Sequence, residues 1–270
     1  MKRAWFALTV AVVVLWSLGP FLWQLVSSLK PDNELIRLPP VLPVHPTLNH
    51  YVAVFTGASF LRIIANSIVV ASSSTLLSIS VGSLAAFGLA KLRVRFRGLI
   101  LLFVLSASMF PPIATVSPLY LIIRAIGLRD TWGALIITYT SFSLPLSVWV
   151  LTHFFREIPD ELYRASRIDG CSPFQSFIRV MMPLAAPGIF TAAILAFIFS
   201  WNEFLFALTF TATPNSRTIP VAIALFPGLH EVPWGDIAAA SVIVTVPLVV
   251  LVLLFQRRIV EGLTAGAVKG

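Results

Sequence analysis

The stretch REIPDELYRASRIDGCSPFQSFIRVMMP, from Arg156 to Pro183, is a long polar and charged segment between two runs that are too apolar for a surface facing water. The whole chain is 58% hydrophobic and 11% charged, whereas soluble domains carry about 25% charged residues. We therefore expect an all-α, multi-pass membrane protein in which residues 156–183 form the main water-exposed segment.

Six apolar runs predict six transmembrane helices in a single membrane domain of residues 1–270, because a helix of roughly 20 residues crosses a bilayer. The expected spans are residues 4–29, 63–90, 99–123, 132–155, 184–210 and 237–255. The first run is longer than a signal-peptide core, so we expect it to be retained. Pro111 and Pro112 predict a kink in the third span, and the small residues of the second predict that it packs inside the bundle.

Positive charges predict the orientation, because Lys and Arg accumulate in cytosolic loops. With the N-terminus in the cytosol, thirteen of the nineteen Lys and Arg residues fall on the cytosolic side. Both termini, the 156–183 segment and a tail of residues 257–270 are then cytosolic, and the proline-rich loop of residues 30–60 is extracytoplasmic. The net charge of +8 is thus a topology signal, and nucleic acid is not an expected partner.

Two short helices joined at Gly170 are predicted within the polar stretch. Asp160 and Glu161 favour the start of the first helix, and Gly170 can adopt the left-handed conformation that ends it. Residues 172–175, Ser-Pro-Phe-Gln, have the pattern of a capping box, so a second helix begins there and is expected to end at Pro183. Four residues at helical spacing give it one apolar face: Phe174, Phe177, Ile178 and Met181. A helix lying along the membrane surface is an alternative reading of that face.

The order of residues in this stretch resembles the cytosolic loop of permease subunits of bacterial ABC importers. The family pattern is Glu-Ala-Ala, three residues, Gly, nine residues, Ile, any residue, Leu-Pro. The chain has Arg164-Ala165-Ser166, Gly170 and Val180-Met181-Met182-Pro183 at the same spacing, and Arg167-Ile168-Asp169-Gly170 is similar to the carbohydrate-uptake branch. Two positions depart from the pattern, since Arg164 replaces the glutamate and Ser166 replaces the second alanine.

Other segments extend the resemblance to the MalG-type permeases of maltose and trehalose importers over nearly the whole chain. They are Ser28-Leu29-Lys30, Leu48-Asn49-His50-Tyr51, Asn66-Ser67, Trp201-Asn202-Glu203-Phe204 and the tail Gly262-Leu263-Thr264-Ala265-Gly266-Ala267-Val268-Lys269-Gly270. The tail is the most specific of these segments. The resemblance implies an ABC type I importer permease fold in a bacterial cell membrane.

The resemblance also implies a transport subunit and not an enzyme. Such a subunit forms half of the route for a disaccharide such as trehalose or maltose and works by alternating access. The implied partners are two ATP-binding subunits, a second homologous permease, an extracytoplasmic sugar-binding protein and the lipid membrane. The sequence has no Gly-x-x-x-x-Gly-Lys-Ser/Thr phosphate loop, so ATP and Mg would be bound by partner subunits, and we expect no cofactor or metal in this chain.

Three groups of candidate site residues follow. For coupling to the ATPase, the resemblance implies Asp160, Glu161, Arg164, Ala165, Ser166, Asp169, Gly170 and Pro183. For contact between the tail and the ATPase dimer, it implies Gly262, Leu263, Thr264, Gly266, Lys269 and Gly270. Trp201, Asn202 and Glu203 are candidates for the sugar route, because an ionisable residue inside a span is a functional-site hypothesis; a structural or interfacial role is the alternative.

Two other classes of function are weaker alternatives. A secondary transporter driven by an ion gradient would place ionisable groups or broken helices near the midplane, often in paired repeats. An intramembrane enzyme would need buried catalytic polar groups, and the predicted spans offer no nucleophile, base and orienting group together. We therefore predict no catalytic residues and favour ATP-driven import.

Overall fold

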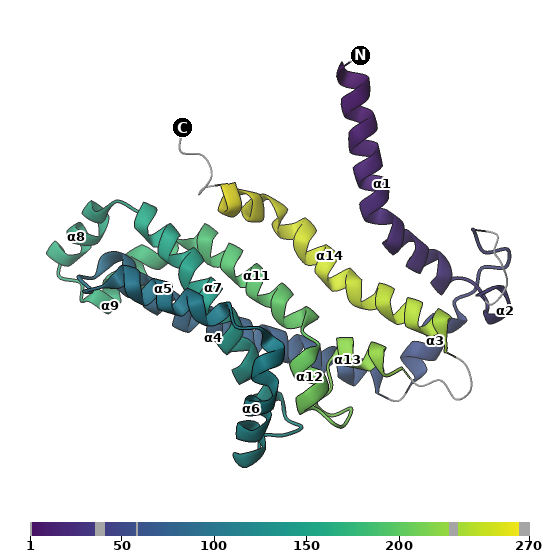
Figure 1. The fold of residues 1–270 in the computed structure, drawn as a ribbon. Helices are drawn as coiled ribbons and strands as arrows, with labels where there is room; N and C mark the ends of the chain where they lie inside the picture. The colour runs from purple at the N-terminus through teal and green to yellow at the C-terminus, as the bar shows by residue number, and fades with distance from the viewer. Residues whose placement is uncertain (1, 36–40, 58, 227–231, 265–270) are drawn as a thin grey trace. The chain divides into compact units, whose positions relative to one another are not determined.

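The computed structural model describes residues 2–35, 41–57, 59–226 and 232–264, and the regular structure in these ranges is helical (Figure 1). Four of its helices are long and apolar enough to cross a membrane: Trp5–Ser28, Phe60–Lys91, Trp132–Glu157 and Trp234–Gln256. If each of two bent helix pairs is counted as one broken span, the described residues contain up to six spans. The expected all-α membrane fold is confirmed.

Contacts divide the chain into two compact units, of residues 1–64 with 219–251 and residues 65–218 with 252–270. The helices of unit 1 are α1 (Lys2–Ser28), α2 (Asp32–Leu35), α3 (Asn49–Thr56), α13 (Ile219–Ala224) and most of α14 (Trp234–Thr264). Those of unit 2 are most of α4 (Phe60–Lys91), α5 (Arg97–Ser108), α6 (Pro112–Ala125), α7 (Trp132–Glu157), α8 (Asp160–Ile168), α9 (Pro173–Ser176), the π-helix η1 (Phe177–Met181), α10 (Met182–Leu184), α11 (Ala186–Asn202) and α12 (Leu205–Phe210).

A buried histidine joins three elements of unit 1. The His50 ring on α3 lies 2.8 Å from the carbonyl oxygen of Lys30 through Nε2 and 2.7 Å from the carboxylate of Asp236 on α14 through Nδ1. Next to it, the hydroxyls of Ser28 and Tyr51 lie 2.7 Å apart. Two segments that the sequence comparison with MalG-type permeases singled out, residues 28–30 and 48–51, are therefore in contact in the structure.

The second span packs inside unit 2, as its small residues predict. Ser74 of α4 donates to the hydroxyl of Ser200 on α11 at 3.0 Å, and the hydroxyls of Ser78 and Ser147 on α7 lie 2.9 Å apart. All four of these serines are buried. Short polar side chains of this kind let membrane helices approach closely and satisfy their own hydrogen bonds across the interface.

The loop between α6 and α7 is fastened to the loop after α12 by Asp130. Its carboxylate accepts hydrogen bonds from the backbone amides of Ala212 (2.7 Å) and Thr213 (3.1 Å) and from the hydroxyls of Thr213 and Ser216. Burial alone would raise the pKa of Asp130, but these donors lower it to about 2. Asp130 has a φ of 60°, a backbone conformation that Asp tolerates better than most residues.

The third span contains the predicted kink at the two prolines, and it is nearly a right angle. Helix α5 ends at Ser108, α6 begins at Pro112, and the two helices are bent by 88°. Pro111 cannot donate a backbone hydrogen bond, and proline suits the first position of a new helix. The pair therefore forms two separate helices rather than one bent rod.

The last helix continues beyond the predicted span. Helix α14 begins at Trp234 and continues to Thr264, so the backbone of Gly262, Leu263 and Thr264 is helical, whereas its membrane-crossing part, Trp234–Gln256, ends close to the expected residue 255. The other predicted tail residues, Gly266, Lys269 and Gly270, lie outside the described residues.

The contact between α7 and α11 requires a glycine at position 188. A methyl group on Gly188 would lie 2.2 Å from Cγ of Phe154, whereas one on Gly88 of α4 would meet nothing within 4 Å. We expect Gly188→Ala to lower the stability of the detergent-solubilised protein by about 1–3 kcal/mol through overpacking, measured as a lower thermal unfolding midpoint. Gly88→Ala gains the same helix propensity without the clash. Equal midpoints for the two variants would contradict this packing.

Candidate functional site

The polar stretch begins with a helix whose end is built as the sequence predicts. Helix α8 has Asp160 and Glu161 in its first turn and is followed by Gly170 with a φ of 86°. The amide of Gly170 donates to the carbonyl of Arg167 at 3.3 Å, and that of Cys171 donates to the carbonyl of Ser166 at 3.1 Å. This pair of bonds is the Schellman arrangement, which needs a left-handed residue after the helix.

The second helix begins at the predicted capping box. The Ser172 hydroxyl accepts from the amide of Gln175 at 3.2 Å, and the Gln175 side-chain oxygen accepts from the amide of Ser172 at 2.7 Å. Each side chain satisfies a backbone donor that the start of a helix leaves free. The two caps fix the turn between α8 and α9 from both sides.

The second helix ends one residue after Pro183, close to the predicted position, but its winding is not the expected α-helix throughout. After Ser176 the chain winds as a π-helix, in which the amide of Met182 donates to the carbonyl of Phe177, five residues back. Helix α10 then carries the chain past Pro183 to Leu184, and the direction changes by 81° before α11. A π-turn widens the backbone, which accommodates a proline that has no amide to donate.

The π-turn also divides the apolar face that the sequence predicted for this helix. Phe177 and Met181 are buried, but Phe174 is 60% exposed and Ile178 is 49% exposed. An α-helical spacing of 3.6 residues would place all four side chains on one side. The wider turns rotate Ile178 away, so the prediction of a single face is wrong.

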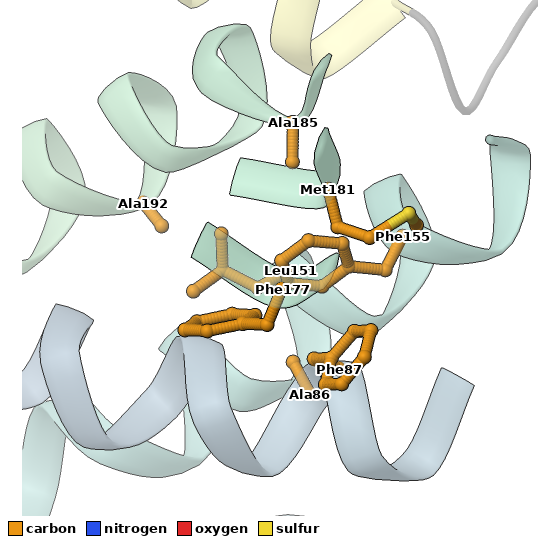
Figure 2. Packing of buried hydrophobic residues seen from close by; sticks show 8 residues of the cluster. All are labelled: Ala86, Phe87, Leu151, Phe155, Phe177, Met181, Ala185 and Ala192. Carbon is orange, nitrogen blue, oxygen red and sulfur yellow. The ribbon is translucent and has the colours of Figure 1, made fainter. Parts of the chain in front are cut away.

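Aromatic rings bind the polar stretch to the membrane helices (Figure 2). The ring centroid of Phe87 on α4 lies 5.2 Å from that of Phe177 of the π-helix and 6.1 Å from that of Phe155 of α7, and Figure 2 labels these three residues. The ring of Tyr163 on α8 lies 5.7 Å from that of Phe87. The contacts of Phe87 with Phe155 and with Tyr163 are edge-to-face. This geometry contributes about 0.5–1.5 kcal/mol of stability beyond the burial of the rings. Ala86, Leu151, Met181, Ala185 and Ala192 complete the buried cluster of Phe87, Phe155 and Phe177, and Tyr163 packs against it partly buried.

An ion pair fixes the start of α8 to the end of α4. The ammonium group of Lys91 donates to the carboxylate of Asp160 at 2.6 Å and to the carbonyl oxygen of Ile158. The Lys91 side chain is 2% exposed and that of Asp160 is 61% exposed. The hydrogen bond and charge of Lys91 hold the pKa of Asp160 below its ordinary value, with smaller contributions from Arg164 and Arg97.

The two departures from the family pattern have different structural settings. Ser166 is buried, its hydroxyl donates to the carbonyl of Tyr163 at 2.7 Å, and it lies 2.8 Å from the hydroxyl of buried Ser176. Ser166 therefore joins α8 to α9. Arg164 is exposed on α8 and lines a basic cavity together with Lys91. The remaining predicted coupling residues Asp160, Glu161, Ala165, Asp169, Gly170 and Pro183 are all exposed.

The three candidates for the sugar route lie where the predicted fifth span breaks. Helix α11 ends at Asn202 and α12 begins at Leu205, so a continuous helix over 184–210 is wrong. The carboxylate of Glu203 accepts from the amides of Phe206 and Ala207 and caps α12. Trp201 is buried against Phe197, with ring centroids 5.6 Å apart. Asn202 is exposed and donates to the carbonyl of Ile198.

Sequence reasoning missed the residues that attach this site to the membrane helices. Phe87 lies within an apolar span, where nothing distinguishes it from a lipid-facing phenylalanine. Lys91 has the signature of a solvated basic turn, yet its side chain is buried. Its position directly after the span and the acidic start of α8 are the signals that could have suggested an ion pair.

Comparison with known proteins identifies the family. Residues 78–264 match the family described as "Binding-protein-dependent transport system inner membrane component". The chain belongs to this family. It is a multi-pass inner-membrane permease subunit of an ABC importer, and hydrolysis of ATP lies in a separate subunit. The importer depends on a binding protein, and an ion-gradient mechanism has no support.

Relatives match the permease over its full length. The trehalose transport system permease protein SugB of Mycobacterium tuberculosis is 45% identical, over 100% of this chain and 98% of the relative. The trehalose/maltose transport system permease protein MalG of Thermococcus litoralis is 42% identical over the same shares. The sulfoquinovosyl glycerol transport system permease protein SmoH of Agrobacterium fabrum is 42% identical, over 97% of this chain and 93% of the relative.

A solved structure shares the fold. The crystal structure of a bacterial ABC transporter involved in import of the acidic polysaccharide alginate aligns with a TM-score of 0.82 over 95% of both chains. The sequence identity is 20%, so this likeness supports the importer permease fold and carries no argument about substrate.

The contact between Ser166 and Ser176 can be tested by a double-mutant cycle. We expect Ser166→Ala to destabilise the permease by about 1–3 kcal/mol, because it leaves the buried Ser176 hydroxyl without its partner. Adding Ser176→Ala should recover part of this loss in denaturant unfolding. Ser141→Ala, which removes an exposed hydroxyl bonded only within its own helix, is the control. Strictly additive losses for the two buried serines would show that they do not interact.

Proposed function

We propose that this permease forms half of the translocation route of an ATP-driven importer for a disaccharide such as trehalose or maltose. The observation that carries the proposal is the full-length identity of 45% and 42% to two permeases named for trehalose and for trehalose/maltose transport. A permease named for sulfoquinovosyl glycerol transport is 42% identical to this chain, the same identity as the trehalose/maltose permease. The common chemistry of these named substrates is a glycoside, and the α-linked disaccharide is favoured by the first relative.

The proposed docking surface for the ATP-binding subunits is the exposed side of α8, the turn at Gly170 and α9. Asp160, Glu161, Arg164, Ala165, Asp169 and Gly170 are exposed there, and Ser166 lies beneath them. Ile168 and Phe174 add apolar surface, since these residues are 85% and 60% exposed. Large exposed apolar residues beside charged ones suit a protein interface.

The attachment of this surface suits transmission of force. The Phe87 cluster and the pair between Lys91 and Asp160 connect α8 and the π-helix to α4 and α7, two membrane-spanning helices. A displacement of the docked loop would therefore move the ends of those helices. Pro183 belongs to this connection rather than to the docking surface, since it lies in the helix that leads toward α11.

The proposed assembly places this chain beside a second homologous permease, on two ATP-binding subunits, and below an extracytoplasmic sugar-binding protein. Both termini and residues 156–183 are cytosolic in this arrangement. In the proposed assembly, the tail residues Gly262, Leu263, Thr264, Gly266, Lys269 and Gly270 contact the ATPase dimer. The permease needs no cofactor of its own, because ATP and Mg bind to the partner subunits.

The break between α11 and α12 is the proposed place where this chain meets the sugar. Asn202 is exposed at the break and carries an amide suited to hydroxyl groups. Glu203 would hold the break open by capping α12, and Trp201 would support it from the buried side. The assignment thus gives direct sugar contact to Asn202 and positioning to its two neighbours.

Reconstitution in liposomes tests the proposed function. We expect the complete transporter, supplied with its external binding protein, to take up labelled trehalose only when ATP is enclosed, and ATP hydrolysis to rise when trehalose or maltose is added. A β-linked disaccharide such as lactose serves as the control. Uptake that persists without ATP in the presence of an ion gradient would refute ATP-driven import, and stimulation by lactose alone would refute the substrate class.

The turn at Gly170 yields a prediction about coupling. We expect Gly170→Val to uncouple ATP hydrolysis from uptake, because a β-branched residue is strained at a φ of 86° by about 1–3 kcal/mol. Gly170→Asn, which tolerates this backbone region, should retain most of the coupled uptake. The measurement is the number of sugars imported for each ATP hydrolysed. The same ratio in the valine variant and the unmodified transporter would refute the role of this turn.

A further inference from the structure

A cavity of about 760 Å³ lies beside the start of α8 in unit 2. Its walls are the end of α4, the turn that leads to α5, the first residue of α5 and one side of α8. The charged residues that line it are Lys91, Arg93, Arg97, Arg164 and Asp160. Four cations thus face one carboxylate around a single space.

Three of these positive charges form no ion pair of their own within the described residues, and the carboxylate that interacts with two of them, Asp160, is shared. Lys91 is already paired with Asp160 at 2.6 Å. Within the described part of the chain, no carboxylate lies within ion-pair distance of the guanidinium groups of Arg93, Arg97 or Arg164. Guanidinium groups remain charged at any physiological pH. The cavity therefore attracts an anion.

The surroundings of the cavity place it at the boundary between water and lipid. Lys91 ends one apolar span and Arg97 begins the next apolar helix. In the turn between them Phe96 is 62% exposed, and Leu99 in the first turn of α5 is 63% exposed. Exposed Phe and Leu side chains beside Lys and Arg are typical of segments at the level of the lipid headgroups.

We propose that this cavity binds the phosphate group of an anionic membrane phospholipid. The planar forks of Arg93, Arg97 and Arg164 match phosphate oxygens and can bind them bidentately. Phe96 directly precedes the lining residue Arg97 and Leu99 follows it by two residues, and both are exposed, so they would be available to acyl chains of a bound lipid. Inorganic phosphate shares the headgroup chemistry, but it has no apolar part to use these residues.

The bound headgroup would join two segments that also meet through Lys91 and Asp160. Arg93 and Arg97 flank the turn between α4 and α5, whereas Arg164 belongs to the segment proposed to dock on the ATPase. Arg164 stands where the family pattern has a glutamate, and an acidic side chain at this position would repel a phosphate. The replacement therefore has a physical explanation that does not require an acidic partner on the ATP-binding subunit.

Lipid titration of the assembled transporter tests the proposal. The complex is stripped of lipid in detergent, titrated with phosphatidylglycerol or phosphatidylcholine, and examined by native mass spectrometry. We expect phosphatidylglycerol to be retained and phosphatidylcholine to be lost. Millimolar inorganic phosphate should leave the bound phosphatidylglycerol in place. Displacement by inorganic phosphate would identify a phosphate site and overturn the lipid assignment, as would equal retention of both lipids.

Variants of neighbouring arginines test whether lipid binding depends on the residues that line the cavity or only on the positive charge of this turn. Arg93→Gln and Arg97→Gln should each weaken retention of phosphatidylglycerol on the order of tenfold, the effect of losing a charged hydrogen bond. Arg95→Gln is the matched control, because Arg95 does not line the cavity and stacks 4.8 Å from the Phe96 ring. Arg97→Lys keeps the charge and should lose less than Arg97→Gln.

Assembly of each variant is confirmed by size-exclusion chromatography before lipid is added. Arg93 lies in an exposed turn outside any helix, so Arg93→Gln carries the test if Arg97→Gln fails to assemble. Unchanged retention in the glutamine variants, or an equal loss in Arg95→Gln, would show that the cavity does not bind the lipid. A negative result in this test would not contradict the proposed sugar transport, because the test measures lipid binding and not sugar uptake.

Discussion

The position of the Phe87 ring constrains the whole end of unit 2 that carries α8, α9 and the π-helix. One side chain on α4 touches rings from α7, α8 and the π-helix at centroid distances of 5.2 to 6.1 Å. Protein interiors are close-packed, so these elements have few ways to slide past one another. The polar stretch is therefore packed against the ends of the membrane helices and should move together with them.

The π-helix is the local adjustment that makes this attachment possible. An ordinary α-helix from Ser172 would carry Phe174, Phe177, Ile178 and Met181 on one face and would meet Pro183 with an unfilled hydrogen bond. The wider winding sends Phe177 and Met181 into the cluster and leaves Phe174 outside. Such single-turn insertions are frequent at functional sites, and here the insertion separates residues that hold the loop from residues that are free to meet a partner.

Features governed by neighbours in sequence could be predicted, and features governed by distant contacts could not. The helix end at Gly170 and the capping box at Ser172 depend on a few adjacent residues, and both are confirmed. Six apolar segments also follow from length and hydropathy. Glu203 was misplaced inside a continuous span, because the helix breaks there and its carboxylate caps α12. The meeting of Phe87 with Tyr163 and Phe177 joins segments about 80 to 90 residues apart, which no local pattern records.

The buried ammonium of Lys91 has a consequence for how this permease can evolve. Its side chain is 2% exposed and its charge is met by a carboxylate on a different segment. A substitution that removed Asp160 alone would leave a positive charge with little water and one carbonyl oxygen, a costly state for a buried ion. A substitution that removed Lys91 alone would free the acidic start of α8 from the membrane helix. The two positions should therefore covary among homologous permeases, so that either an ion pair is kept at both or a neutral or apolar pair replaces it.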